Sequence, residues 1–305
     1  MNKVDTLLVI ARKFNDVFYA VSTPEWGNAR HRILAIFAKA EFAGQFPFRE
    51  EFDDVILFNS ENSRMSYVAM LRKIRKEKER VLCDAVMLSN MVLVANQYLI
   101  KMSKCHQVIA LEDGLMNYYD FRPSSYWMKC LAQWLIGINQ KELFGLISHT
   151  YLLNPSMAQY YGGDAVRLQL SPTIIQKRIQ LDIQGKKIFV GQRPYHFGQM
   201  SLETYCERVN LFVKKYSIDY YLPHAFADLE ERVDCPILDI AKLQVTLEIL
   251  ALQYDFTVYS FNSSVLYSTR IINPRIKTYL VRIPELCEMS EVPILKKYCS
   301  GSIDF

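Results

Sequence analysis

The sequence lacks the patterns that would identify a cofactor at once. Its seven cysteines are odd in number, scattered, and never form a Cys-x-x-Cys pair, which argues against structural zinc and against a disulfide framework. Neither G-x-G-x-x-G nor G-x-x-x-x-G-K-[ST] occurs, so the chain has no dinucleotide fingerprint and no Walker loop. No stretch reaches the roughly 18 apolar residues of a membrane helix. We therefore expect reduced thiols in a cytoplasmic protein that needs no metal and no cofactor.

Strong charge is also missing. The formal net charge of +4 over 305 residues does not suggest a nucleic-acid binder, although it suits an anionic ligand or an anionic membrane surface. A basic helix over residues 63–80, together with Lys296 and Lys297, could contact lipid, but such a run is more often a solvated face. A peripheral contact with the inner face of the membrane and a homodimer are both compatible with the sequence.

Apolar and aromatic residues are abundant. Half of the chain is hydrophobic, with 19 Tyr and 17 Phe, and its 305 residues exceed the size at which one core stops growing. Apolar strands alternate with helices throughout, which is typical of parallel α/β sheets. We predict an α/β protein with two Rossmann-like domains facing a cleft (1–155 and 186–305), joined by a linker region (156–185).

Individual elements are predicted from the apolar spacing. In the first half, strands are expected at 6–11, 53–59, 83–88, 107–111 and 144–153, and helices at 28–43, 63–80, 97–103 and 123–138. In the second half, strands are expected at 186–190, 218–222, 256–260 and 278–283, and helices at 201–215, 240–253 and from 265 onward.

Two carboxylates mark the end of one predicted strand. The apolar run 108–111 is followed by Glu112, Asp113 and Gly114, and the carboxyl ends of parallel strands are where ligands bind in open α/β sheets. Gly114 can adopt the positive φ of a sharp exit from a strand. A solvated acidic turn is the alternative, and for this triplet alone it is the better interpretation. Asn117 and Tyr118 come next as a candidate wall on the acceptor side.

Three strand ends of the second half carry polar residues. They comprise Gly191 with Gln192, Pro223 with His224, and the pair Ser263 and Ser264. Two hydroxyls that open a helix suit a phosphate group, and a histidine can donate a proton to a leaving phosphate. A helix cap, an ordinary loop histidine and a plain turn are the alternatives, each preferable if its feature is taken alone. Their shared position at strand ends favours a site.

These features resemble bacterial sialyltransferases of glycosyltransferase family 52, the lipooligosaccharide sialyltransferase group. The resemblance is carried by Leu111–Gly114 as an acidic motif, Tyr221–Ala225 as a His-Pro motif, Phe261–Ser264 as a paired-serine motif, Leu247–Leu250 as a ribose-binding helix and Val190–Gln192 as a Gly-Gln turn. One departure is Ala225, which stands where the family has proline after the histidine, while Pro223 precedes it.

The resemblance implies a GT-B fold and a function. It implies inverting, metal-independent transfer of sialic acid from CMP-sialic acid to a hydroxyl of a lipooligosaccharide or capsule glycan. Asp113 would be the general base, with Glu112 and Gly114 in support. His224, Ser263 and Ser264 would bind the departing phosphate. Glu248 would hold the ribose, with Gly191, Gln192 and Pro223 around the nucleotide.

Other functions stay open on the residues alone. The donor could be another nucleotide sugar, because nothing in the residues specifies sialic acid. Glu112 or Asp113 with a second carboxylate could make a glycoside hydrolase, although that leaves the histidine and the serine pair without a role. A nucleotide- or glycan-binding protein without turnover is the third alternative.

Overall fold

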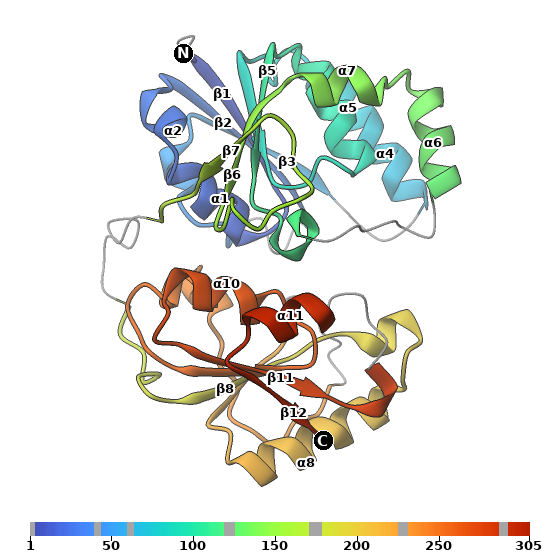
Figure 1. The fold of residues 1–305 in the computed structure, drawn as a ribbon. Coiled ribbons are helices and arrows are strands. Elements are labelled where there is room, and N and C mark those ends of the chain that lie inside the picture. Colours follow the sequence, from blue (N-terminus) through green and yellow to red (C-terminus); the bar gives the residue numbers. More distant parts are fainter. Residues whose placement is uncertain are drawn as a thin grey trace. The chain divides into compact units, whose positions relative to one another are not determined.

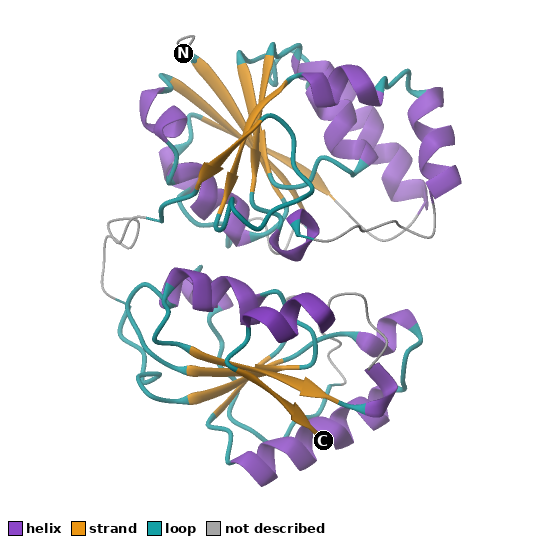
Figure 2. Cartoon of the chain, in the orientation of Figure 1, coloured by secondary structure: helices purple, strands orange, loops and turns teal. Residues whose placement is uncertain are grey.

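The chain consists of two compact α/β units. The computed structural model describes residues 4–39, 44–59, 64–118, 126–170, 179–224, 231–286 and 292–305. The two units are Met1–Ile174 and Ile175–Phe305. Figures 1 and 2 show that each unit has its own sheet with helices on its faces.

The first unit contains a seven-stranded parallel sheet in the order β3-β2-β1-β4-β5-β6-β7. Its strands are β1 (Thr6–Ala11), β2 (His31–Ala38), β3 (Asp54–Asn59), β4 (Ala85–Leu88), β5 (Gln107–Leu111), β6 (Ile147–Leu152) and β7 (Asp164–Arg167). The strand order reverses between β1 and β4. In such sheets the loops that leave the carboxyl ends of strands at this reversal form the usual ligand-binding crevice.

Helices cover both faces of this sheet. They are α1 (Phe14–Val21), α2 (Pro24–Asn28), α4 (Arg64–Lys76), α5 (Val94–Ser103), α6 (Tyr126–Leu135) and α7 (Gln140–Gly145). Figure 1 shows α1 and α2 on one side and α4, α5 and α7 on the other. Met70, Leu99 and Leu143, from the latter three helices, share one buried cluster with the apolar residues of the strands.

Two predictions for the first unit were wrong. The helix expected at 28–43 is the strand β2, in which Ile33 to Phe37 are at most 2% exposed. A central parallel strand is buried on both faces, so its continuous apolar run also matches a helical period and periodicity alone cannot separate the two. The strand expected at 144–153 is present as β6, but the first unit was expected to end soon after it, at residue 155. The sheet instead continues with β7, which pairs with β6 and lies within the expected linker.

The second unit repeats the architecture with five parallel strands in the order β12-β11-β10-β8-β9. Its strands are β8 (Lys187–Val190), β9 (Tyr220–Leu222), β10 (Thr257–Ser260), β11 (Lys277–Arg282) and β12 (Gly301–Asp304), and its helices are α8 (Leu202–Tyr216), α9 (Leu247–Leu250), α10 (Val265–Ile272) and α11 (Val292–Tyr298). Figure 1 shows α8 on one face and α10 and α11 on the other. The strand order reverses between β8 and β10.

The helix expected at 240–253 is much shorter than its pattern suggested. Only α9 and a preceding turn at Ala241–Leu243 are helical, because Gln244 adopts a left-handed conformation with φ 55° that ends the turn. No element was predicted where α11 and β12 lie.

Aromatic residues fill the core of the second unit, which accounts for much of their abundance. Phe189 packs against Phe212 and Phe261 with ring centroids 5.4 and 5.3 Å apart. The buried hydroxyls of Tyr205 and Tyr221 lie 3.1 Å apart, so each polar end has a partner. The predicted fold class, two Rossmann-like α/β units, is confirmed. Among the described residues, no helix is both long enough and apolar enough to cross a membrane.

Candidate functional site

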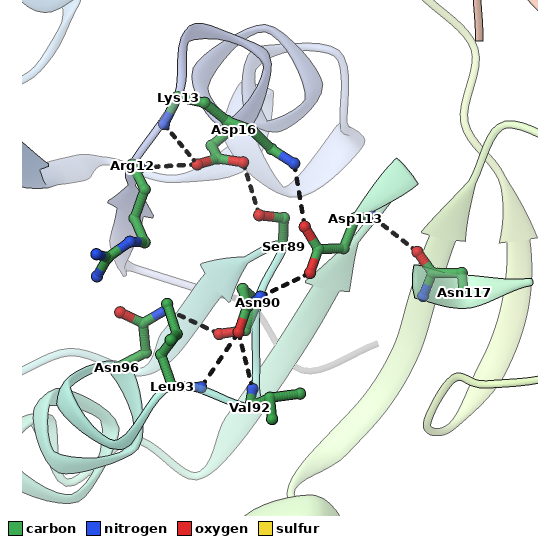
Figure 3. A network of polar contacts seen from close by, with 10 residues as sticks. All are labelled: Arg12, Lys13, Asp16, Ser89, Asn90, Val92, Leu93, Asn96, Asp113 and Asn117. Atoms are coloured by element: carbon green, nitrogen blue, oxygen red, sulfur yellow. Dashed lines mark hydrogen bonds and ion pairs between the residues drawn. The ribbon is translucent and has the colours of Figure 1, made fainter. Parts of the chain in front are cut away.

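Asp113 follows β5, the strand next to the reversal point between β1 and β4. Its Oδ1 is 3.0 Å from Lys13 Nζ, and its Oδ2 accepts a hydrogen bond of 2.8 Å from Asn90 Nδ2 (Figure 3). Lys13 comes after β1, Asn90 after β4 and Asp113 after β5, so three neighbouring strands contribute to one polar cluster. The Asp113 side chain remains 13% exposed, which leaves the carboxylate within reach of a ligand.

The amide of Asn90 is oriented by its own loop. Its Oδ1 accepts the backbone N–H groups of Val92 at 3.0 Å and Leu93 at 3.1 Å. Because the oxygen is occupied there, the NH₂ group is turned toward Asp113. The backbone of the loop after β4 therefore fixes the Asn90 side chain in the orientation that donates to Asp113.

The loop after Asp113 has the shape that the sequence predicted. Gly114 adopts φ 61°, the left-handed region that side chains disfavour. Asn117 Oδ1 accepts the backbone N–H of Asp113 at 2.7 Å, and its Nδ2 donates to the carbonyl of Tyr160 at 3.1 Å. Asn117 therefore holds the backbone of the candidate base in place.

Glu112 points into the protein. It is 1% exposed, and its Oε2 accepts hydrogen bonds from the Tyr118 hydroxyl at 2.8 Å and the Leu153 N–H at 2.7 Å. Within the described chain, its Oε1 has no hydrogen-bond partner. Burial raises the pKa of Glu112 to about 7, although both hydrogen bonds oppose the shift. Tyr118, expected on the acceptor side, donates its hydroxyl to Glu112.

A second buried carboxylate shapes the exit from β1. Asp16 Oδ2 accepts the backbone N–H groups of Arg12 at 2.7 Å and Lys13 at 3.0 Å, and Oδ1 accepts the Ser89 hydroxyl at 2.6 Å (Figure 3). Burial raises the pKa of Asp16. These bonds tie the start of α1 to the end of β4, which places Lys13 beside Asp113.

The sequence reasoning missed Lys13, Asp16 and Asn90. The signal was available, because Arg12 and Lys13 come directly after one apolar strand and Ser89 and Asn90 directly after another. The same rule that selected Asp113 would have selected Lys13 and Asn90, had it been applied to every strand end.

In the second unit, Gly191 is required by packing. A Cβ at this position would lie within 2.8 Å of Tyr221 Cζ and 3.1 Å of the Tyr205 hydroxyl. The next residue, Gln192, donates its backbone N–H to the Tyr205 hydroxyl at 2.9 Å. Glycine therefore lets the loop pass close to two buried tyrosines, whether or not a nucleotide binds there.

Arg193 and His224 come together at the ends of β8 and β9. Burial, together with the positive charge of Arg193, lowers the pKa of His224 to about 4. The Arg193 Nε is buried without a hydrogen-bond partner among the described residues. A histidine with this pKa is neutral at neutral pH, so it can offer a hydrogen bond but is a poor proton donor. The fixed positive charge is that of Arg193, next to Gln192 in the chain. Pro223 lies directly before His224, and Ala225 lies outside the described residues.

Glu248 and the serine pair occupy another corner of the second unit. Ser263 Oγ accepts the Val265 N–H at 3.3 Å, while Ser264 is the N-cap residue of α10. Ser268 Oγ lies 2.9 Å from Glu248 Oε1 and 3.2 Å from the Ser264 carbonyl. Ser268 therefore connects Glu248 to the first turn of α10.

Metal ligands are not clustered in the part of the chain that the structure describes. No group of three or more His, Cys, Asp or Glu side chains there could hold an ion.

Comparison with known proteins shows likeness in fold only. The sequence matches no protein-family model and no curated protein. The structure resembles that of UDP-N-acetylglucosamine 2-epimerase from Rickettsia bellii with a TM-score of 0.56 and 12% identity, over 95% of this chain and 81% of that one. The enzyme from Neisseria meningitidis bound to UDP-GlcNAc has a TM-score of 0.55 and 11% identity, over 96% of this chain and 85% of that one. The enzyme from Methanocaldococcus jannaschii in complex with UDP-GlcNAc and UDP has a TM-score of 0.52 and 11% identity, over 98% of this chain and 87% of that one.

These findings overturn the assignment to sialyltransferase family 52. No family model matches the sequence, and the similar structures named above are of UDP-N-acetylglucosamine 2-epimerases, not of enzymes that use CMP-sialic acid. The motifs misled because each is short. An acidic turn with glycine, a histidine next to proline and a serine pair before a helix are ordinary features of strand ends and helix caps.

Proposed function

We propose that this protein is a glycosyltransferase that uses a nucleotide sugar, most readily a UDP-sugar, and needs no metal ion. The observation that carries the proposal is the Asp113 carboxylate, held by Lys13 and Asn90 next to the reversal point of a parallel sheet and still partly exposed.

The first unit would supply the base. Asp113 takes the proton of an acceptor hydroxyl, and the oxygen attacks the anomeric carbon of the donor sugar. The bond from that carbon to the phosphate oxygen breaks, the nucleotide leaves with the electron pair, and the configuration inverts. Lys13 at 3.0 Å and Asn90 at 2.8 Å hold the carboxylate in one orientation.

The second unit would supply the groups that bind the nucleotide. The Arg193 charge has no hydrogen-bonded acceptor at its Nε within the described residues and would compensate phosphate charge. The neutral His224 and the hydroxyls of Ser263 and Ser264 would add hydrogen bonds, and Glu248 would accept those of the ribose. Gln192 and Pro223 would line the same edge as neighbours of Arg193 and His224.

The choice of UDP rests on the similar structures, which contain UDP-GlcNAc or UDP. The test is release of the nucleotide from a panel of UDP-, GDP- and dTDP-sugars, with and without EDTA and with a mixed glycan acceptor pool. We expect UDP release that increases with acceptor and is unaffected by EDTA. Release from no member of the panel would contradict the proposal, and loss with EDTA would contradict its metal-independent form.

Epimerisation of a UDP-sugar is a second candidate, because the similar structures are those of UDP-N-acetylglucosamine 2-epimerases. Inversion at a ring carbon that bears hydrogen requires that the C–H bond break. Solvent deuterium incorporated into the UDP-sugar without any acceptor would favour epimerisation over transfer.

The positions of Glu112 and Asp113 disfavour the hydrolysis of glycosides. The Glu112 carboxylate is 1% exposed and bonded to Tyr118 and Leu153, so it cannot flank a glycosidic bond together with Asp113. Thermal stabilisation by UDP without any turnover would instead indicate a binding protein. Contact with a membrane surface and a homodimer stay predictions.

A further inference from the structure

Arg12 is a charged residue at the carboxyl edge of the first sheet that the proposed mechanism does not use. It comes directly after β1 and precedes Lys13. Figure 3 shows its guanidinium turned away from both Asp16 and Asp113. The side chain is partly buried, and burial lowers the pKa of Arg12, although the group remains a cation at neutral pH.

The neighbouring carboxylates are already occupied. Asp16 accepts two backbone N–H groups and the Ser89 hydroxyl, and Asp113 accepts Lys13 and Asn90. Across the described residues, the Arg12 guanidinium makes no direct ion pair or hydrogen bond, and the Asp16 charge acts on it only from a distance. A partly desolvated cation that no carboxylate pairs with directly is unfavourable for folding, and an external anion bound at this edge would stabilise it.

The surroundings of Arg12 leave its donor face available. Its Cζ lies 5.4 Å from the ring centroid of Phe37, at the end of β2. Its positive charge interacts electrostatically with the Tyr67 hydroxyl on α4. An aromatic ring beneath a guanidinium holds its plane, while the N–H groups around the rim stay free to bind a planar oxyanion with two oxygens.

We propose that Arg12 binds an oxyanion of the acceptor, a carboxylate or a phosphate, so that the acceptor is an acidic glycan. The proposal rests on the proposed function, since it takes the substrate of the Asp113 side to be the acceptor. Lys13 links the two groups, because it is next to Arg12 in the chain and contacts Asp113. An acid group on Arg12 would orient the attacking hydroxyl toward the base.

The test measures binding without any donor. The probes are methyl β-D-glucuronide, glucose 6-phosphate and methyl β-D-glucoside, titrated by calorimetry and by ligand-observed NMR. We expect at least one acidic probe to bind about tenfold or more tightly than the neutral glucoside, and this preference to vanish in Arg12→Gln. The acidic probe with the higher affinity shows whether the site prefers a carboxylate or a phosphate.

Arg167→Gln is the matched control, because Arg167 ends β7 on the same unit and is exposed. It should keep the full preference, whereas Arg12→Lys should keep only part of it because lysine retains the charge and loses the fork. Thermal unfolding of each variant checks that the unit is folded. Equal binding of all three probes, binding of none, or an unchanged preference in Arg12→Gln would overturn the inference.

Failure of the proposed function gives a different result. If no UDP-sugar is consumed but Arg12→Gln still abolishes the preference for an acidic probe, the oxyanion site stands and the transferase assignment falls. If a UDP-sugar is consumed while the probes bind alike, the transferase stands and the acidic acceptor falls.

Discussion

The two sheets share a topology but carry different residues at the ends of equivalent strands. Each has its first strand in sequence beside the reversal point, and an arginine comes after that strand, Arg12 after β1 and Arg193 after β8. Two strands away, Glu112 and Asp113 come directly after β5. In the equivalent place Ile283 and Pro284 come directly after β11.

Under the proposed function, this difference would adapt one fold to two tasks. The first edge combines a carboxylate, a lysine and an amide in one hydrogen-bonded cluster, which suits the handling of a proton. The second edge presents Arg193 beside a neutral His224, and the hydroxyls of Ser263 and Ser264 follow the neighbouring strand β10, which suits the binding of phosphate. The shared topology specifies where the ligand edges lie, and the residues after each strand specify their chemistry.

Removing the carboxylate from the first edge should have the largest effect. Asp113→Asn keeps the size of the side chain but cannot accept a proton, so we expect nucleotide release with acceptor to fall by about 10²–10⁴-fold. Steady-state rates with a saturating donor measure this. Activity within about threefold of wild type would remove Asp113 from the role of base, since general-base catalysis contributes far more than that. Unchanged UDP affinity would show that the second edge is intact.

Removing the charge from the second edge should affect binding more than chemistry. Arg193→Gln should weaken the affinity for UDP about 10- to 100-fold, because a charge-assisted bond to phosphate is lost. Calorimetric titration with UDP and with uridine separates the phosphate contribution, and Arg208→Gln is a control because that arginine is paired with Glu285 at 2.7 Å. An equal loss for uridine would contradict a phosphate contact.

The buried acid of the first edge should make stability depend on pH. The pKa of Glu112 is raised from 4.5 to about 7, so the folded protein binds this proton more tightly than the unfolded chain and loses stability as pH rises between those values. Glu112→Gln lacks this loss. Relative to wild type, its free energy of unfolding should rise by about 3 kcal/mol from about pH 4 to about pH 8. Parallel pH curves from urea unfolding would show that Glu112 titrates normally.

A packing change should produce the smallest effect and locate the role of Gly191. Because a Cβ would meet the buried Tyr221 ring, Gly191→Ala should lower the free energy of unfolding by about 1–2 kcal/mol. Gly145→Ala is the control, since Gly145 also lacks a positive φ and its Cβ would meet nothing within 4 Å. A variant as stable as wild type but weaker in UDP binding would assign Gly191 to the ligand instead.

Much of the architecture can be predicted from local patterns. The apolar runs of β3, β5 and β10 were predicted as strands, because the strand residues and the turn signals that bound them are adjacent in the chain. The error at β2 has a definite cause: a strand buried on both faces has no alternation to read, and only its pairing with β1 and β3 identifies it.

The sequence by itself determined that the chain is an α/β protein with two Rossmann-like units and that polar residues collect where strands end. Only the tertiary structure decided how those residues are used. Asp113 and Glu112 are adjacent in sequence, yet one meets Lys13, a hundred residues away, and the other meets Leu153. The neutral state of His224 likewise depends on burial and on Arg193 from another strand. Partners distant in sequence set charge and exposure, and no local pattern records them.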